Sequence, residues 1–314
     1  MRAPGEARER QSGGMSSTDL GAFTRRAALR AGATDAQLRA PTLASPFHGV
    51  RTRVMPVTHL ERAVAYLPRL RPWQLFSHLT AAEAWGVPLP ARPEEDDPIH
   101  VAATRPHRPP RTRGVIGHTL AETDRVQRHG LPVTGAASTW IALGSLLSAR
   151  DLLAATDHLL FEPRFPRRGE LRPFVTLLEL QDRLAGHGGR GRRGLTVALQ
   201  LASTGAASRK ETLLRALVQE AGLPAPEVNA EIRVDGRLLA IGDLVFRRWK
   251  VVAEYDGGQH RTDDAQFSRD RERLLALHLA GWIVVVVRAE GLARGRARTI
   301  AELRAALDAH GWRP

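Results

Sequence analysis

Three acidic residues in the C-terminal third of the chain have the types and spacing of a metal site. Asp243 lies in the segment IGDLVF, whereas Glu254 and Asp256 lie in VVAEYD, and both segments are otherwise mostly apolar. Both segments are expected to be strands, in which alternate side chains share a face. If they pair symmetrically about a turn centred between residues 248 and 249, Asp243 lies directly opposite Glu254, with Cβ atoms about 4.5–5.5 Å apart.

Two carboxylates opposed within apolar strands repel one another, so one must be protonated or a cation must lie between them. Oxygen ligands at this spacing suit Mg²⁺, with Mn²⁺ as the alternative. Asp256, at the end of its strand, is a candidate third ligand. His260, four residues further on, is a candidate general base. The sequence therefore predicts a divalent-metal site with a candidate general base beside it.

Each of these residues also has an ordinary structural interpretation. Asp243 and Glu254 could face solvent with Arg247 or Arg248 as partners, Asp256 could belong to a simple turn, and His260 could be a loop histidine. Glu211 fits the third position of a capping box that begins at Ser208, a role favoured over a link to the metal. Asp270 and Arg273 are spaced as an intrahelical ion pair.

The elements around these carboxylates follow a clear order, α-β-β-β-α-β-α. Asp235-Gly236 is a type I′ hairpin signal between the first two strands. Gly222 and Gly281 are positioned to end the first two helices. The expected ranges are helix 208–220, strands 228–234, 238–246 and 250–255, helix 267–280, strand 282–287 and helix 298–310.

The N-terminal part is expected to be mainly helical. Thr24 and Thr34 are potential caps of two short helices that flank Gly32, a pattern consistent with a helix-turn-helix or with any small helical hairpin. Further on, the sequence predicts a helix that Ser77 or Thr80 caps and that continues through Ala84, a strand at 99–102, and helices at about 140–160 and 175–184. Residues 105–113 form a basic loop rich in Pro and Arg, and 186–194 a flexible basic loop.

Charge is distributed unevenly along the chain. The formal net charge is +13, and residues 1–207 contain 28 Lys and Arg against 18 Asp and Glu, while residues 208–314 contain 18 against 15. The basic surplus in the first two thirds favours a polyanionic partner, although a GC-rich genome, which enriches arginine in its proteins, would produce a similar bias. The predicted DNA contacts are Arg25, Arg26, Arg105, Arg111 and Arg113.

The composition also excludes some classes of protein. With no cysteine, the chain has neither disulfides nor thiolate metal ligands. No apolar run approaches the roughly 20 residues that span a bilayer, so no membrane partner is expected. The N-terminus lacks the apolar core of a secretory signal, which predicts a cytoplasmic location. Residues 1–20 are expected to be disordered, and Met15 is an alternative start.

Residues 208–292 resemble the very-short-patch-repair-like branch of the PD-(D/E)xK endonuclease superfamily. The segments that carry the resemblance are SRKETLLRALVQEAGLPAP, IGDLVF, VVAEYDGGQH, QFSRDRERLLALHLAGW and IVVVVR. The resemblance implies an α/β restriction-endonuclease-like domain that hydrolyses DNA with Mg²⁺. The resemblance also implies that Asp243 and Glu254 bind the metal. Asp256 and His260 would support them, with Glu211 as a further candidate. Asp256 stands where many of these nucleases have lysine, and His260 would compensate, as a histidine does in that branch.

A second, looser resemblance covers residues from about 23 to 160. The segments FTRRAALRAGATDAQL, SHLTAAEAWGVPLP, GVIGHTLAETDRVQRHGLPVTGAASTWIAL and LLAATDHLL are similar to AbiEi-type antitoxins of type IV toxin–antitoxin systems. This similarity implies an N-terminal winged helix-turn-helix, a DNA partner, and a cognate toxin protein as a further partner. The expected organisation is 1–20 disordered, 21–165 an AbiEi-like module, 166–204 a linker and helix, and 205–314 a nuclease-like domain.

Together these features predict a DNA endonuclease with a DNA-binding N-terminal module. Two rival interpretations stay open. The protein could be a DNA-binding transcriptional regulator whose nuclease fold has lost activity, or an antitoxin that sequesters a toxin. A regulator has no need to keep two carboxylates opposed in an apolar hairpin, which favours the enzyme.

Overall fold

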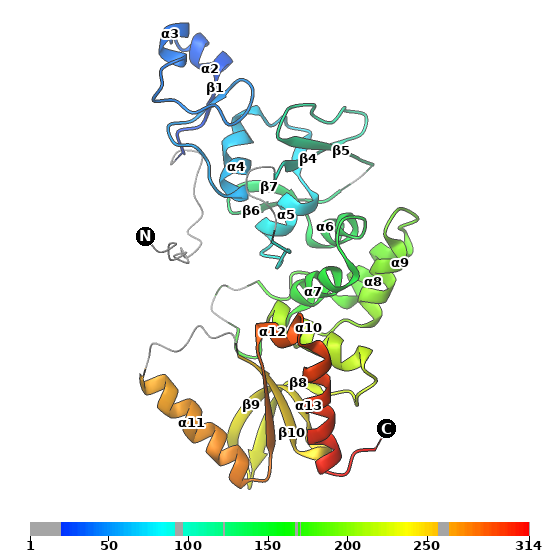
Figure 1. The fold of residues 1–314 in the computed structure, drawn as a ribbon. Helices are drawn as coiled ribbons and strands as arrows, with labels where there is room; N and C mark the ends of the chain where they lie inside the picture. The colour runs from blue at the N-terminus through cyan, green and yellow to red at the C-terminus, as the bar shows by residue number, and fades with distance from the viewer. Residues whose placement is uncertain are drawn as a thin grey trace. The chain divides into compact units, whose positions relative to one another are not determined.

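The computed structural model describes residues 20–91, 97–121, 123–166, 169, 171–256 and 264–313, with the backbone alone for 264–270. Two compact units make up the chain, Met1–Leu143 and Gly144–Pro314. The segment expected to be disordered lies outside the described residues except for Leu20, and His260 lies outside them as well. The chain is a mixed α and β protein, as expected (Figure 1).

The first unit contains helices around a five-stranded mixed sheet of order β5-β4-β3-β7-β6. Strands β1 and β2 form a separate two-stranded ladder. The elements are β1 Phe23–Thr24, α2 Arg25–Arg30, α3 Asp35–Leu38, β2 Val50–Arg51, α4 His59–Tyr66, the 3-10 helix η1 Leu67–Arg69, β3 Gln74–Phe76, α5 His78–Ala84, β4 Ile99–Thr104, β5 Val115–Leu120, β6 Arg125–Arg128, β7 Leu131–Thr134 and α6 Ala136–Leu143.

The two short N-terminal helices begin where the sequence places their caps. The Thr24 hydroxyl accepts a hydrogen bond from the amide of Ala27, and Thr34 and Gln37 form a complete capping box. Gly32 follows the first helix with φ of +92°, a conformation that glycine adopts without strain. Both predicted caps are therefore confirmed.

The N-terminal module contains more strand than expected, because β3 to β7 form a five-stranded sheet beside its helices. These strands are short, and β7 (LPVT) contains Pro132, a residue that usually argues against a strand. Pro132 pairs with Gln127 of the edge strand β6. On its other side β7 is paired with β3 only at Val133 and Phe76, so the missing amide of Pro132 removes no described pair with β3. Local patterns of four residues are too short to predict such strands, so only β4 was anticipated.

The second unit begins with three helices and continues with a four-stranded sheet. The elements are α7 Ala149–Leu160, α8 Leu177–Ala185, α9 Arg192–Gln200, α10 Arg209–Glu220, β8 Glu227–Val234, β9 Arg237–Phe246, the 3-10 helix η2 Arg247–Trp249, β10 Val251–Tyr255, α11 Asp264–Leu279, β11 Ile283–Val287, α12 Ala289–Leu292 and α13 Arg296–Ala309.

Two predicted segments differ from the structure. The helix expected over 140–160 is divided, because α6 ends at Leu143 and Ser148 caps a new helix by accepting from the amide of Asp151. The expected flexible loop 186–194 ends early, because α9 begins at Arg192. Gly191, with φ of +86°, reverses the chain before that helix.

The sheet of the second unit has the order β11-β10-β9-β8, with β10 parallel to β11 and the other pairs antiparallel. Helices α10 and α13 pack on one face, where Leu214, Leu303 and Phe246 belong to one buried cluster. Helix α11 covers the other face, where Leu277 packs with Val245 and Val252 (Figure 1). This layering gives each face of the central hairpin a different environment.

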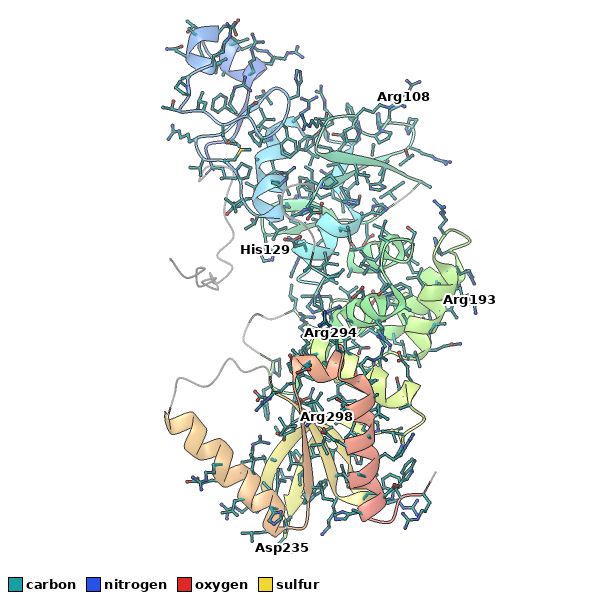
Figure 2. All side chains as sticks on the ribbon, in the orientation of Figure 1. Arg108, His129, Arg193, Asp235, Arg294 and Arg298 are labelled. Atoms are coloured by element: carbon teal, nitrogen blue, oxygen red, sulfur yellow. The ribbon has the colours of Figure 1, made fainter. Side chains whose placement is uncertain are left out.

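The hairpin between β8 and β9 turns at Asp235 and Gly236, as predicted. Both residues have positive φ, +48° and +78°, and Val234 pairs with Arg237 across them. A two-residue turn with both central φ angles positive is type I′. Asp235 lies at the tip of this hairpin (Figure 2).

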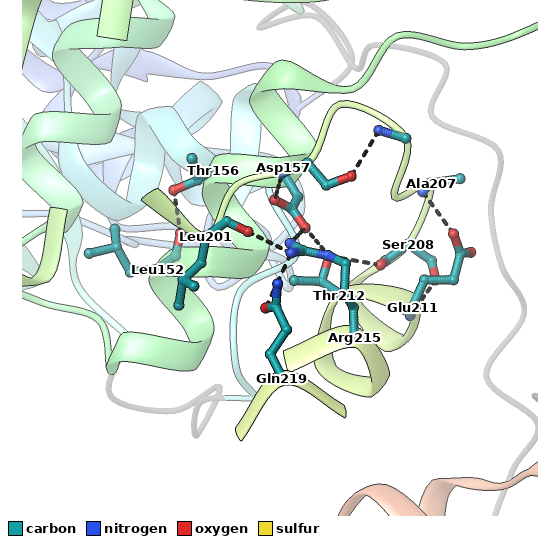
Figure 3. Close-up of polar contacts among 12 residues, drawn as sticks. Leu152, Thr156, Asp157, Leu201, Ala207, Ser208, Glu211, Thr212, Arg215 and Gln219 are labelled. Carbon is teal, nitrogen blue, oxygen red and sulfur yellow. Dashed lines mark hydrogen bonds and ion pairs between the residues drawn. The ribbon is translucent and has the colours of Figure 1, made fainter. Parts of the chain in front are cut away.

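Helix α7 belongs to the second unit, whereas the sequence places a boundary near residue 165. The physical link is a buried ion pair between Asp157 of α7 and Arg215 of α10, with side chains 1% and 5% exposed (Figure 3). Thr212 and the amide of Ser203 also donate hydrogen bonds to Asp157, each at 2.8 Å. Burial raises the pKa of Asp157, and Arg215 opposes that rise.

Within the described part of the chain, no helix combines the length and the apolar character that crossing a membrane requires.

Removing the partner of Asp157 should destabilise the second unit strongly. Arg215→Met keeps most of the apolar stem but leaves a buried carboxylate without its counter-charge, which typically costs about 3–5 kcal/mol. The two remaining hydrogen bonds to Asp157 favour the lower part of this range. Urea unfolding measures the loss. Arg298→Met is the control, because it breaks an exposed pair with Glu302 and should change little. Equal stability of Arg215→Met and the wild type would contradict the assigned role of the pair.

Candidate functional site

The hairpin formed by β9 and β10, the two central strands of the sheet in the second unit, has the register that the sequence predicts. Val251 pairs with Phe246, Val252 with Val245 and Ala253 with Leu244, so the next step along this register brings Asp243 beside Glu254. The turn between the strands is the 3-10 helix η2 followed by Lys250, whose φ is +46°. Asp243 Oδ2 accepts a hydrogen bond of 2.7 Å from the amide of Tyr255. The hairpin therefore brings both carboxylates to the face that α11 covers.

Glu254 is engaged by Arg273 of α11. The guanidinium donates two hydrogen bonds to the two carboxylate oxygens, the Nη2–Oε2 bond measuring 2.8 Å. The Glu254 side chain is 14% exposed. A two-point contact of this kind is a strong, charge-assisted interaction. Arg273 thus binds Glu254, whereas the intrahelical pair with Asp270 that its spacing suggests stays a prediction, because the Asp270 side chain lies outside the described residues.

Asp243 is the carboxylate of the site whose pKa is shifted. Burial, the largest influence, raises the pKa of Asp243 to about 6. The hydrogen bond from Tyr255 opposes this rise, whereas the charges of Glu211 and Glu254 add to it. Arg273 lowers the pKa of Asp243 only as the smallest of these influences. Three carboxylates from α10, β9 and β10 therefore act on one another here, and one arginine does not fully compensate them.

Glu211 has a different hydrogen-bonding pattern from the predicted capping box. Ser208 caps α10 by accepting from the amide of Glu211 at 3.2 Å, as expected (Figure 3). The carboxylate of Glu211 instead accepts from the amide of Ala207 at 2.9 Å and from the side-chain amide of Asn229 at 2.7 Å. The capping box is therefore only half formed, because Glu211 reaches past Ser208. Asn229, whose φ is +47°, was not predicted to contribute.

Asp256 lies at the end of β10, where its amide donates to the carbonyl of Val287. Its carboxylate forms an ion pair of 3.3 Å with Arg288, and its side chain is 36% exposed. His260 belongs to residues 257–263, outside the described part of the chain, so its predicted role as base stays a prediction.

The solvent-facing alternative for the hairpin is not observed. Arg247 pairs with Glu227, and the Arg248 guanidinium lies 5.4 Å from the Trp249 ring centroid. Lys250 donates to the carbonyl of Ala280. These cations thus have other partners, and Asp243 and Glu254 are shielded by α11.

The carboxylates are close enough to affect one another but are not arranged as ready ligands. Among the described residues, no group of three carboxylates has its oxygen atoms within 4.8 Å of one another; one group of three histidines meets that spacing. These are His78, His100 and His118 of the first unit, named here the histidine cluster.

The histidine cluster was not predicted, because its members come from three separate elements. His78 begins α5, His100 lies in β4 and His118 in β5. The parallel register of β4 and β5 pairs His100 with Ile116 and Ala102 with His118, so the two histidines are diagonal neighbours on one face. The sequence does contain a histidine in each of two strand-like segments, IHVA and GVIGH. That these histidines lie side by side could be predicted only if the pairing of the two strands were known.

The first unit also contains a basic groove of about 840 Å³. Among the described residues that line it there is no carboxylate. Its arginines, named here the groove arginines, are Arg25, Arg26, Arg30, Arg51, Arg69, Arg71 and Arg111.

Three of the predicted DNA contacts line this groove, and two do not. Arg25, Arg26 and Arg111 are exposed lining residues, although Arg25 also pairs with Asp35. Arg105 and Arg113 are exposed on the loop between β4 and β5, on which Arg108 also lies (Figure 2). Arg51, Arg69 and Arg71 were missed because they come from separate parts of the sequence, and Arg30 was missed although it lies on α2 with Arg25 and Arg26.

Comparison with known proteins identifies two relatives. The uncharacterized proteins MT2308 of Mycobacterium tuberculosis (strain CDC 1551 / Oshkosh) and Rv2248 of strain H37Rv are each 30% identical to this chain over 122 residues. The match covers 38% of this chain and 45% of each relative, so the chain spans less than half the length of these curated relatives. No protein-family model matches the sequence. No solved structure matches it either.

Proposed function

We propose that the second unit is a metal-dependent endonuclease of the PD-(D/E)xK type, which cleaves or nicks DNA with Mg²⁺ or Mn²⁺. The observation that carries the proposal is that the charges of Glu211 and Glu254 act on a partly buried Asp243, whose pKa is raised to about 6. Carboxylates that repel one another inside a protein are a common mark of functional sites. The α-β-β-β-α-β succession from α10 to β11 supports the same family.

The donor set fits a hard divalent cation. Asp243 and Glu254 would hold the ion directly, with Asp256 as the third candidate ligand, because Mg²⁺ binds through few carboxylates and keeps several waters. A bound ion would polarise the scissile phosphate and help deprotonate the attacking water. Glu211 acts at a distance, because its carboxylate is held by Ala207 and Asn229. His260 is the candidate base.

The first unit is proposed to hold the DNA. Its groove presents arginines from α2, η1 and the loop after β4, and a surface of this kind attracts the phosphate backbone without regard to sequence. The two short helices with confirmed caps are consistent with a helix-turn-helix, and β1 and β2 with a small wing.

A specific observation favours the alternative of a DNA-binding regulator or type IV antitoxin without nuclease activity. Glu254 is held by two hydrogen bonds from Arg273, and Asp256, at the position where many of these nucleases have lysine, pairs with Arg288. In this alternative, arginines replace the metal as counter-charges, and a cognate toxin would be a partner.

The first prediction of this proposal concerns cleavage. In Mg²⁺ or Mn²⁺, the full-length protein should nick or cut plasmid DNA, and Asp243→Asn should lower the rate more than about 100-fold, since even supporting groups of metal sites contribute about 10–100-fold. His260→Ala should slow cleavage about 10²–10⁴-fold if His260 is the base. Gel analysis of plasmid forms measures both.

The matched control for cleavage is Glu227→Gln, an exposed acid of the same sheet paired with Arg247. It should cut at the wild-type rate. If the wild type cuts no DNA form, and its melting temperature does not change in millimolar Mg²⁺ or Mn²⁺, the enzyme is excluded and the regulator takes its place, because a bound ion stabilises the folded state by mass action.

The second prediction concerns pH. The pKa of Asp243 is about 6 in the folded protein against 3.8 in the ordinary carboxyl, so its charged form costs stability above pH 6. Without divalent ions, Asp243→Asn should therefore raise the free energy of unfolding at pH 8, by at most about 3 kcal/mol at 1.36 kcal/mol per pKa unit. The gain should shrink as pH falls from 6 towards 4.

Urea unfolding at several pH values, each compared with the wild type at the same pH, measures this gain. Glu227→Gln should show the opposite sign, because the hydrogen bond from Arg247 lowers the pKa of Glu227 and its charged form is stabilising. A loss of stability in Asp243→Asn at pH 8 would show that Asp243 is paired structurally, and would contradict the metal site.

The third prediction concerns the basic groove. Full-length protein in EDTA should bind duplex DNA with an affinity that falls steeply with salt, since each phosphate neutralised by the protein releases counterions. Arg26→Gln combined with Arg111→Gln should reduce the slope of log affinity against log salt by about 2, one for each arginine removed from a phosphate. Arg193→Gln, an exposed arginine of α9, is the control (Figure 2). An unchanged slope in the double variant would place the DNA elsewhere.

A further inference from the structure

The histidine cluster joins three ring systems from separate elements in a partly buried part of the first unit. His100 is 4% exposed, and His78 and His118 are half-buried. His100 Nδ1 and His118 Nε2 lie 2.9 Å apart, and the centroids of the His78 and His118 rings lie 3.5 Å apart. One ligand nitrogen from each residue fits within a 4.8 Å group.

Hydrogen bonds from the surrounding residues position the backbone of the histidine cluster and one of its ring nitrogens. His78 Nδ1 lies 3.0 Å from the hydroxyl of Ser77, a buried residue, so this nitrogen has a hydrogen-bond partner and Nε2 is directed elsewhere. The amide of His100 donates to Thr80 Oγ1 at 2.7 Å, and the amide of Ser77 donates to the carbonyl of His100. Support of this type, in which the second ring nitrogen is hydrogen-bonded, is the usual companion of a metal-binding histidine.

His78 also has an uncommon backbone conformation. Its φ is +51°, in the left-handed region that residues with a Cβ seldom adopt. Such a residue is retained where the surrounding structure requires it, often at a binding site. Here the conformation begins α5 and brings the imidazole of His78 against that of His118.

We propose that His78, His100 and His118 bind one transition-metal ion of the Zn²⁺ class, through three imidazole nitrogens and a water. Imidazole donors prefer Zn²⁺, Co²⁺, Ni²⁺ and Cu²⁺ over Mg²⁺, so this site is chemically distinct from the carboxylates of the second unit. Three protein ligands and one open position match zinc sites that retain a water.

Metal binding requires two local changes. His100 and His118 share one N–H between their facing nitrogens, so the donor ring must carry its proton on the other nitrogen to free two lone pairs. The rings, now inclined by only 8–24° to one another, must turn so that their in-plane lone pairs converge. The χ2 torsion of histidine has a broad energy profile, so no steep torsional barrier opposes this turn.

The protonation state of the rings suits a cation. Burial, followed by the neighbouring His118, lowers the pKa of His78 to about 3, and burial also lowers the pKa of His118. Both rings are therefore neutral at physiological pH, the form in which histidine binds metals.

Metal titration of the full-length, tag-free protein tests the proposal. After treatment with EDTA and dialysis, Co²⁺ should bind one ion per cluster with the visible absorption of a low-coordinate site, and Zn²⁺ should displace it. His118→Gln should weaken Co²⁺ binding more than about 10-fold, the lower bound for loss of even a supporting group. His78→Asn should do the same, and asparagine tolerates a positive φ.

Two controls separate this site from other metal binding. His107→Gln removes an exposed histidine of the same unit that stacks on Trp73 at 4.3 Å, and it should leave the Co²⁺ spectrum unchanged. Asp243→Asn should also bind Co²⁺ at the cluster normally, whatever its effect on DNA cleavage. The proposal is overturned if no saturable Co²⁺ or Zn²⁺ site exists, or if both cluster variants, folded by circular dichroism, bind as tightly as the wild type.

Discussion

The register of β9 against β10 is the constraint on which the second unit depends. In this register Leu244 and Phe246 of β9, with Val251 and Ala253 of β10, pack beneath α10 and α13. Alternation along the same strands then forces Asp243 and Glu254 onto the face that α11 covers. A slip of one residue would turn the acids toward the main core and move Leu244 and Phe246 to the face beneath α11, so the same apolar contacts that fold the sheet also hold the carboxylates together.

The unit compensates its buried acids in two different ways. Asp157 has an arginine, a hydroxyl and an amide as partners, and it links α7 to α10. Asp243 has one amide hydrogen bond, while two further acids act on its charge. The first arrangement is a structural contact. The second arrangement leaves the negative charge of Asp243 incompletely compensated, as is expected of a residue that binds a metal cation for the proposed DNA cleavage.

The first unit combines two kinds of chemistry that do not overlap. Its groove arginines form a surface suited to phosphates, whereas the histidine cluster offers imidazole nitrogen donors from α5, β4 and β5. The cluster depends on the parallel pairing of β4 and β5, so a metal bound there would stabilise the sheet from which the basic loop 105–113 projects.

Local patterns in the sequence were sufficient for the caps at Thr24, Thr34 and Ser208, the Asp235-Gly236 turn, and the hairpin register around residues 248 and 249, because each depends on residues close together in the chain. Only the tertiary structure decided that Arg273 reaches Glu254, that Asn229 holds Glu211, and that His78, His100 and His118 meet. The five-stranded sheet was missed for the same reason. Pairing between distant segments depends on which apolar faces are buried together, and no local spacing contains that information.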